Sequence, residues 1–127
     1  MTASVLKNLS RLLVATLVTV LVGTIVSSPA YAQSTTGPGI ITMYTNGWVQ
    51  DSVRVQLDIP EINPAGCPNT NGYITKPSDP GNHAYQQAVL EAYRTRLVYG
   101  VGHVEITVSN TTCYIGWPQI IGVTLNK

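Results

Sequence analysis

The pattern of apolar and polar residues divides the chain into two parts. An uncharged run covers residues 12–26, directly after two basic residues, Lys7 and Arg11, and a small-x-small site follows at Ala30-Tyr31-Ala32. A basic start, an apolar stretch of this length and such a site together predict a cleavable secretory signal peptide over residues 1–32. The alternative is an uncleaved membrane helix, for which the run is short.

Alternation of apolar and polar residues predicts strands in the remainder of the chain. The clearest case is residues 48–59, where Val53 and Val55 fall on one face and Arg54 on the other. Asn46-Gly47, directly before this segment, is a hairpin turn signal because both residues tolerate positive φ. Four further strands are expected over residues 39–45, 72–76, 104–108 and 120–125.

Helical spacing of apolar residues occurs between residues 83 and 99. Either Asp79 or Asn82 is expected to cap the start of this helix, and Gly100 is expected to end it. Arg96 lies within the apolar stripe, which predicts either a packed stem with a solvated head or a contact with another subunit. The stripe consists of Tyr85, Ala88, Val89, Ala92, Tyr93 and Leu97.

The predicted elements follow the order strand, strand, strand, helix, strand, strand. This is the order of the OB-fold, a five-stranded Greek-key barrel with one α-helix between strands 3 and 4. We therefore predict a mainly β, single OB-fold-like domain over residues 33–127. A small open sheet with one helix packed across it is the competing assignment. Residues 33–38 are polar and contain Gly and Pro, so they are expected to form a loose arm.

The chain has two cysteines, Cys67 and Cys113, and both lie beyond the predicted leader. An even count in an exported domain predicts a disulfide bond, and the alternative is two buried free thiols. Without supporting histidines the pair cannot form a structural zinc site. The leader and the cysteines together predict a secreted or periplasmic protein.

Charge and hydropathy exclude two classes of partner. Residues 33–127 hold five basic and six acidic side chains, which is too few cations for binding nucleic acid through its phosphates. No segment after residue 32 is apolar enough for a membrane span, so none is expected after cleavage.

Local motifs give little evidence of catalysis. The chain has no Gly-x-Ser-x-Gly elbow, no phosphate-binding glycine loop and no paired-histidine zinc motif. His103 and Glu105 match half of the zinc deaminase signature, but the Cys-x-x-Cys half is absent and strand alternation already explains both residues. We therefore expect no enzyme activity, no metal and no cofactor. The alternative is an active site whose groups converge from loops.

Several segments together resemble the receptor-binding B subunits of the subtilase cytotoxin and pertussis-like toxins. They are Gly39-Ile40-Ile41-Thr42-Met43-Tyr44 after a polar arm, Ala65-Gly66-Cys67, the helix over residues 83–99, Gly102-His103-Val104-Glu105-Ile106, and Cys113. The resemblance implies an OB-fold subunit that forms a pentameric ring, binds sialylated host glycans and accompanies an enzymatic A subunit.

This chain departs from those subunits at the positions that contact sugar. Pro38 stands where the resemblance implies a serine before the first strand. Thr107 or Val108 stands where it implies a tyrosine on the strand after the helix, and Asp58 corresponds to its acidic residue at the end of the second strand.

Two functions follow as expectations. The first is a secreted, glycan-binding and oligomeric module, with an arm and two further residues as binding candidates. The second is a stand-alone exported domain that binds a protein partner and has no sugar specificity. The binding candidates for the first are Ser34, Thr35, Thr36, Trp48 and Asp58.

Overall fold

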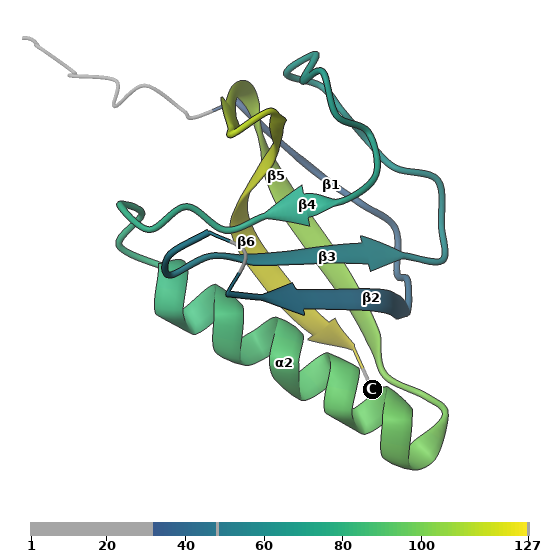
Figure 1. Ribbon diagram of the computed structural model, residues 1–127. Coiled ribbons are helices and arrows are strands. Elements are labelled where there is room, and N and C mark those ends of the chain that lie inside the picture. The colour runs from purple at the N-terminus through teal and green to yellow at the C-terminus, as the bar shows by residue number, and fades with distance from the viewer. Residues whose placement is uncertain (1–31, 48, 127) are drawn as a thin grey trace, which may run out of the picture. The chain divides into compact units, whose positions relative to one another are not determined.

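The computed structural model describes residues 32–47 and 49–126, so the predicted leader lies almost entirely outside the described residues. The described part is mainly β with one helix, which confirms the predicted class (Figure 1). Within these residues no helix has the length and the hydropathy to span a membrane. The elements are β1 (Gln33–Thr35), β2 (Ile41–Asn46), β3 (Val53–Leu57), β4 (Tyr73–Ile74), α2 (Asn82–Tyr99), β5 (His103–Tyr114) and β6 (Trp117–Asn126).

The strands form one mixed sheet in the order β1-β5-β6-β4-β3-β2. Neighbouring strands are antiparallel except β4 and β6, which are parallel where Ile74 pairs with Gln119. The first and last strands of this order, β1 and β2, follow each other in the chain. Between them Gly39 makes an isolated bridge to Val104 of β5. The N-terminal segment therefore supplies the first and the last strand in the order of the sheet.

The prediction of a loose N-terminal arm is wrong, and the sheet has six strands in place of five. Gln33 to Thr35 pair with β5, from Ser109 to Thr107. The next residue, Thr36, is buried, and its hydroxyl accepts a hydrogen bond from the Ile106 amide at 3.0 Å. Backbone and hydroxyl groups hold this strand, so it has no apolar alternation that a sequence pattern could detect.

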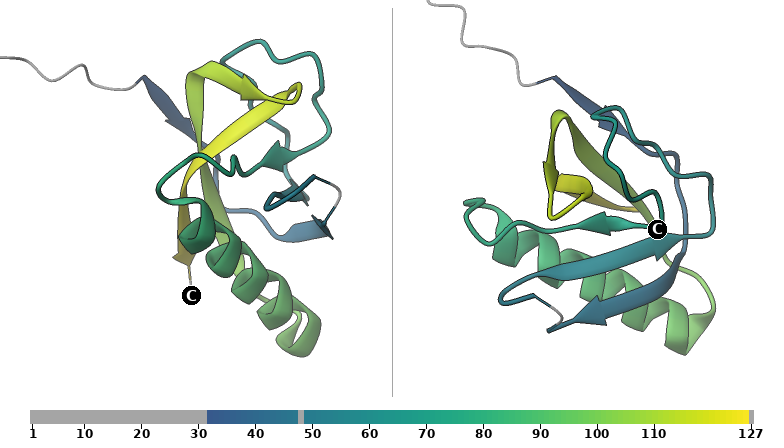
Figure 2. Two further views of the ribbon diagram at one scale, coloured as in Figure 1. Left: turned by 60° about the vertical axis from the view of Figure 1, so that its left-hand side comes forward. Right: turned by 45° about the horizontal axis from the view of Figure 1, so that its top comes forward.

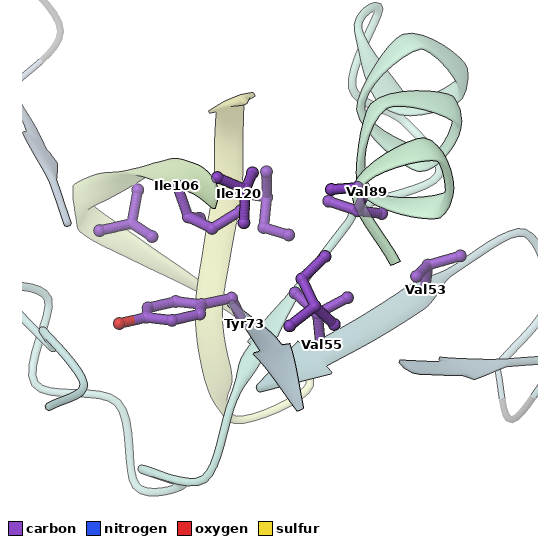
Figure 3. Packing of buried hydrophobic residues seen from close by; sticks show 10 residues of the cluster. Val53, Val55, Tyr73, Val89, Ile106 and Ile120 are labelled. Atoms are coloured by element: carbon purple, nitrogen blue, oxygen red, sulfur yellow. The ribbon is translucent and has the colours of Figure 1, made fainter. Parts of the chain in front are cut away.

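Two groups of strands cross each other and enclose the core. In Figures 1 and 2, β2, β3 and β4 run across β5 and β6, and α2 lies along one side. Val53 and Val55 are fully buried between them, which confirms the predicted inward face of that strand. Their neighbours converge on the same space (Figure 3). The buried cluster comprises Ile41, Val53, Val55, Tyr73, Val89, Ala92, Val104, Ile106, Val108 and Ile120.

The connection between β2 and β3 is longer than the predicted two-residue turn. β3 begins at Val53, whereas the alternation placed its start at residue 48. Asp51 adopts a left-handed conformation with φ of 53°, which bends the chain before the strand. The Asn82 and Gln86 side chains donate to the Asp51 carbonyl at 3.0 and 2.9 Å, and they hold this turn against the start of α2.

Neither predicted residue caps α2. The N-cap is Gly81, which makes no side-chain cap bond, and Asn82 is already the first helical residue. The Asp79 carboxylate accepts from the Gly81 amide at 2.8 Å, so it orders the turn before the helix. Gly100 ends the helix in the left-handed conformation, as predicted.

The apolar stripe of α2 is buried only in part. Val89 and Ala92 are buried, whereas Leu97 is 65% exposed, because the last turn of the helix extends beyond the strands (Figure 1). Arg96 is half-buried and donates from Nη1 to the Ile41 carbonyl at 2.6 Å. Arg96 is therefore packed against the protein, and its guanidinium satisfies the backbone carbonyl of the first residue of β2.

The predicted disulfide is present between Cys67 and Cys113, whose Cα atoms are 5.7 Å apart. It joins the segment between β3 and β4 to the end of β5. Close by, the Asn69 amide donates to the Gly116 carbonyl at 2.9 Å. The bridge and this hydrogen bond fix the segment over residues 58–72 against the β5–β6 turn.

Val55→Asp is expected to destabilise the protein by several kcal/mol, because an unpaired carboxylate would enter the core. Thr42→Asp is the matched control, because Thr42 is exposed on the neighbouring strand and a surface substitution usually changes stability by less than about 0.5 kcal/mol. Urea denaturation of both variants measures the difference. Equal midpoints would show that the strand register is wrong.

Removal of the disulfide by Cys67→Ala with Cys113→Ala is expected to lower the free energy of unfolding by up to about 4 kcal/mol. This value follows from the loop entropy of a bridge between residues 46 apart in sequence. The unfolding midpoint in urea provides the measurement. Wild-type protein with added reductant should show the same loss, and an unchanged midpoint in both samples would contradict the expectation.

Candidate functional site

A polar cluster lies on the side of β3 and β4 that faces away from the core. Its members are two residues of β3, one at the start of β6 and two from the segment before β4. Alternation along β3 directs its even-numbered residues outward while Val53 and Val55 point inward. We call this cluster the β3–β4 face, and it consists of Arg54, Gln56, Glu61, Asn71 and Trp117.

Asn71 is the central acceptor of the β3–β4 face. Its Oδ1 accepts from Trp117 Nε1 at 2.7 Å and from Arg54 Nη1 at 3.3 Å. Its carbonyl accepts from Gln56 Nε2 at 2.6 Å and from Arg54 Nη1 at 3.4 Å. The exposed Asn71 therefore joins three side chains from two distant strands in one hydrogen-bonded network.

Arg54 and Trp117 form the flat part of this face. The Arg54 guanidinium carbon lies 5.1 Å from the centre of a Trp117 ring, a cation–π contact. The Trp117 ring is buried and Arg54 is half-buried, and the Arg54 guanidinium lies over the indole. This stacking orients the guanidinium, whose planar donors suit bidentate recognition.

Beside Gln56 the surface has a hollow of about 350 Å³. Polar side chains at its edge are Gln56, Glu61, Thr70 and Asn71. Leu57, Ile59 and Tyr73 supply apolar surface, and the Tyr73 hydroxyl accepts from the Ile62 amide at 2.9 Å. Polar side chains outnumber apolar ones in this lining, so the hollow suits a ligand that carries many hydrogen-bonding groups.

Glu61 has one satisfied and one unsatisfied carboxylate oxygen. Oε2 accepts from the Gly72 amide at 2.5 Å, whereas Oε1 is buried and meets no hydrogen-bond donor in the part of the chain that the structure describes. Burial raises the pKa of the Glu61 carboxyl, and the Gly72 amide and the positive charge of Arg54 act against that shift. A buried acceptor without a donor is costly, so this oxygen is suited to a ligand that donates a hydrogen bond.

Gly72 is required for this contact. Its φ is 139°, and a Cβ atom there would lie 2.7 Å from the Val55 carbonyl oxygen. A residue with a side chain would push the two strands apart. Glycine lets the Gly72 amide approach Glu61 while the chain enters β4.

The structure describes four of the five binding residues expected from the sequence, and they lie on β1, directly after β1 and directly after β3. Thr36 is buried, and the Thr35 hydroxyl lies 3.0 Å from that of Thr107. Ser34 is half-buried on β1. The Asp58 carboxylate accepts from the Ile40 amide at 2.7 Å, so it holds the link between β1 and β2. Trp48 lies outside the described residues.

A second polar cluster surrounds Asp51, beside a hollow of about 310 Å³ that Tyr44 and Gln87 also line. Its carboxylate accepts from His83 Nε2 at 3.1 Å and from Gln86 Nε2 at 3.3 Å. The hydrogen bond from His83 is the largest of the effects that lower the pKa of Asp51. These contacts satisfy the carboxylate within the protein, in contrast to Glu61.

Across the described ranges, no three His, Cys, Asp or Glu side chains lie close enough together to hold a metal ion. Comparisons with protein-family models, with curated proteins and with solved structures find no significant match for this chain. The toxin resemblance, the ring of five subunits and the enzymatic A subunit therefore stay predictions.

Two residues of the β3–β4 face, Arg54 and Gln56, could be predicted to face outward from the alternation of apolar and polar residues in the sequence. It did not reveal Glu61 or Asn71, which lie in a segment without periodicity. The adjacent cysteine was the one available signal, because a bridge at Cys67 implies that this segment packs against another element.

Glu61→Gln is expected to stabilise the protein at pH 7. The pKa of Glu61 is raised in the folded state, so at pH values above the ordinary Glu pKa the charged carboxylate lowers the free energy of unfolding. This penalty disappears as the pH falls to about 4 or below, where the carboxyl is protonated in both the folded and the unfolded state. The amide keeps an acceptor for Gly72 and has no charge. Urea denaturation at both pH values should show the gain at pH 7 and its loss at the lower pH.

Asp51→Asn is the control of opposite sign. The pKa of Asp51 is lowered in the folded state, so its carboxylate stabilises the fold at neutral pH, and that contribution is lost as the pH falls through the lowered pKa. This variant is expected to be less stable than wild type at pH 7. Changes of the same sign in the two variants would contradict the assignment of their environments.

Proposed function

We propose that this protein is an exported OB-type binding module that binds a sugar on the β3–β4 face. The observation that carries the proposal is the Glu61 carboxylate, which offers a buried oxygen beside a hollow lined by fixed amide groups. Sugar hydroxyls are donors of the kind that this oxygen lacks.

The strand order supports an OB-type fold. If β1 and β2 count as two halves of one bent strand, the sheet has five strands, and α2 lies between the third and the fourth. The pairing of β5 with β1 and of β3 with β2 then returns to the same strand, as in a barrel. In OB-folds, the face of strands 2 and 3 binds oligosaccharides and oligonucleotides, and here those strands are β3 and β4.

Charge favours the sugar of these two ligand classes. Only Arg54 is basic on the β3–β4 face, and Glu61 would repel a phosphate nearby. Apart from the Trp117 indole N–H, which already donates to Asn71, the remaining polar groups of the face are amides, which can both donate and accept hydrogen bonds. Such a set matches hydroxyl groups, which also do both.

The arrangement assigns a different task to each part of the site. Glu61 accepts from a hydroxyl, and Gln56 and Asn71 are already positioned by their hydrogen bonds. The apolar surface of Leu57 and Ile59 packs against the C–H face of a sugar ring. Because these groups are held before binding, little side-chain order has to be gained in the complex.

A glycan array with the oxidised protein tests the proposal, followed by titration calorimetry of any glycan that binds. Glu61→Gln is expected to weaken binding by at least about tenfold, because a hydrogen bond to a charged group contributes about 1.5–3 kcal/mol. Gln56→Ala should weaken it as well.

Gln87→Ala is the matched control, because Gln87 lines the hollow beside Asp51 and is exposed on α2. It should leave the affinity unchanged. If no glycan binds, or if Gln87→Ala reduces binding and Glu61→Gln does not, the β3–β4 face is not the sugar site. Absence of all glycan binding would favour the alternative of a protein partner.

A further inference from the structure

Large apolar side chains are exposed together at the C-terminal end of α2. Figures 1 and 2 show this end of the helix reaching past the strands, on the side where the described chain ends. We call the group the apolar end. Its members and their exposed fractions are Leu97 65%, Val98 69%, Tyr99 74%, Val101 58% and Leu125 48%.

The last turn of the helix is apolar around most of its circumference. Leu97, Val98 and Tyr99 are consecutive, and consecutive helical residues point about 100° apart. A surface helix keeps one polar face, whereas a helix that is apolar all round is normally enclosed. The last turn thus has the composition of an enclosed helix, although water surrounds it in the single chain.

A groove of about 640 Å³ lies beside this end. Ala92 and Thr95 of the helix form one wall, and Val101 and Leu125 form the other. Gly102 brings the two walls together, because a Cβ atom there would lie 3.2 Å from the Ala92 carbonyl oxygen. The chain thus presents an apolar projection next to an apolar groove.

We propose that a second copy of this chain covers the apolar end. The five side chains expose on the order of several hundred Å², the size of the largest apolar patch on a typical monomer, and such a patch is often an interaction site. With the neighbouring groove, the contact would come closer to the ~800 Å² per partner of a standard interface. A second copy brings both the projection and the groove that this surface needs. This proposal is independent of sugar binding on the β3–β4 face.

Charge supports a copy of the chain as the partner. With five basic and six acidic residues over 33–127, the domain has too little net charge to oppose self-association. The same balance disfavours a lipid surface, since anionic membranes attract clusters of Lys and Arg. Near the apolar end, Arg96 is already bound to the Ile41 carbonyl, and Glu91 lines the groove.

Light scattering coupled to size exclusion tests the proposal on the disulfide-bonded protein over a range from about 1 to 100 µM. The wild type is expected to have a mass that is a multiple of the monomer. Val98→Glu is expected to weaken self-association at least tenfold, because it buries a charge in the interface. Since Val98 is exposed in the single chain, the variant should keep the wild-type circular dichroism spectrum, and the two proteins should have the same melting temperature at a concentration where both are monomeric.

Ile115→Asn is the matched control. Ile115 is 44% exposed in the β5–β6 turn, outside the apolar end, so its replacement should leave the mass unchanged. A monomeric wild type at every concentration would overturn the proposal, and so would an oligomer that Val98→Glu leaves intact. A monomer that sediments with phosphatidylcholine vesicles would also overturn it and would assign the surface to lipid.

Discussion

Contact between the two crossing groups of strands is the constraint on which the other features depend. Val53 and Val55 from one group meet Ile106 and Ile120 from the other, and Val89 of the helix closes the same space (Figure 3). Because every second residue of β3 is committed to this contact, the residues between them must face outward. The position of the β3–β4 face is therefore a consequence of core packing.

The features that could be predicted from the sequence are those that leave a periodic pattern of buried residues or require a particular residue type. The alternation around Val55 and the left-handed end of α2 at Gly100 could both be inferred, because each leaves a periodic or residue-specific signal. The strand at Gln33 could not, because backbone pairing with β5 holds it. The bent turn at Asp51 could not either, since it depends on side chains from a helix that lies 31 residues further along.

The candidate site was the least predictable part for the same reason. Glu61 and Asn71 belong to a segment whose conformation is fixed by single contacts to other elements, such as the hydrogen bond from Trp117 to Asn71 at 2.7 Å. Such contacts have no period. Glu61 also opposes stability, because its carboxyl is held where burial disfavours the charge. Residues of this kind are typical of functional positions, where local strain is maintained by the surrounding structure.

The disulfide makes formation of the β3–β4 face depend on the redox conditions around the chain. Cys67 lies four residues before Asn71, and Cys113 lies four residues before Trp117, so the covalent bond brings together the two backbones whose side chains must meet. In a reducing compartment this tether is absent, and the Asn71–Trp117 contact must form at its own entropic cost. The redox state of the compartment in which the chain matures therefore influences how readily the Asn71–Trp117 contact, and with it the β3–β4 face, forms.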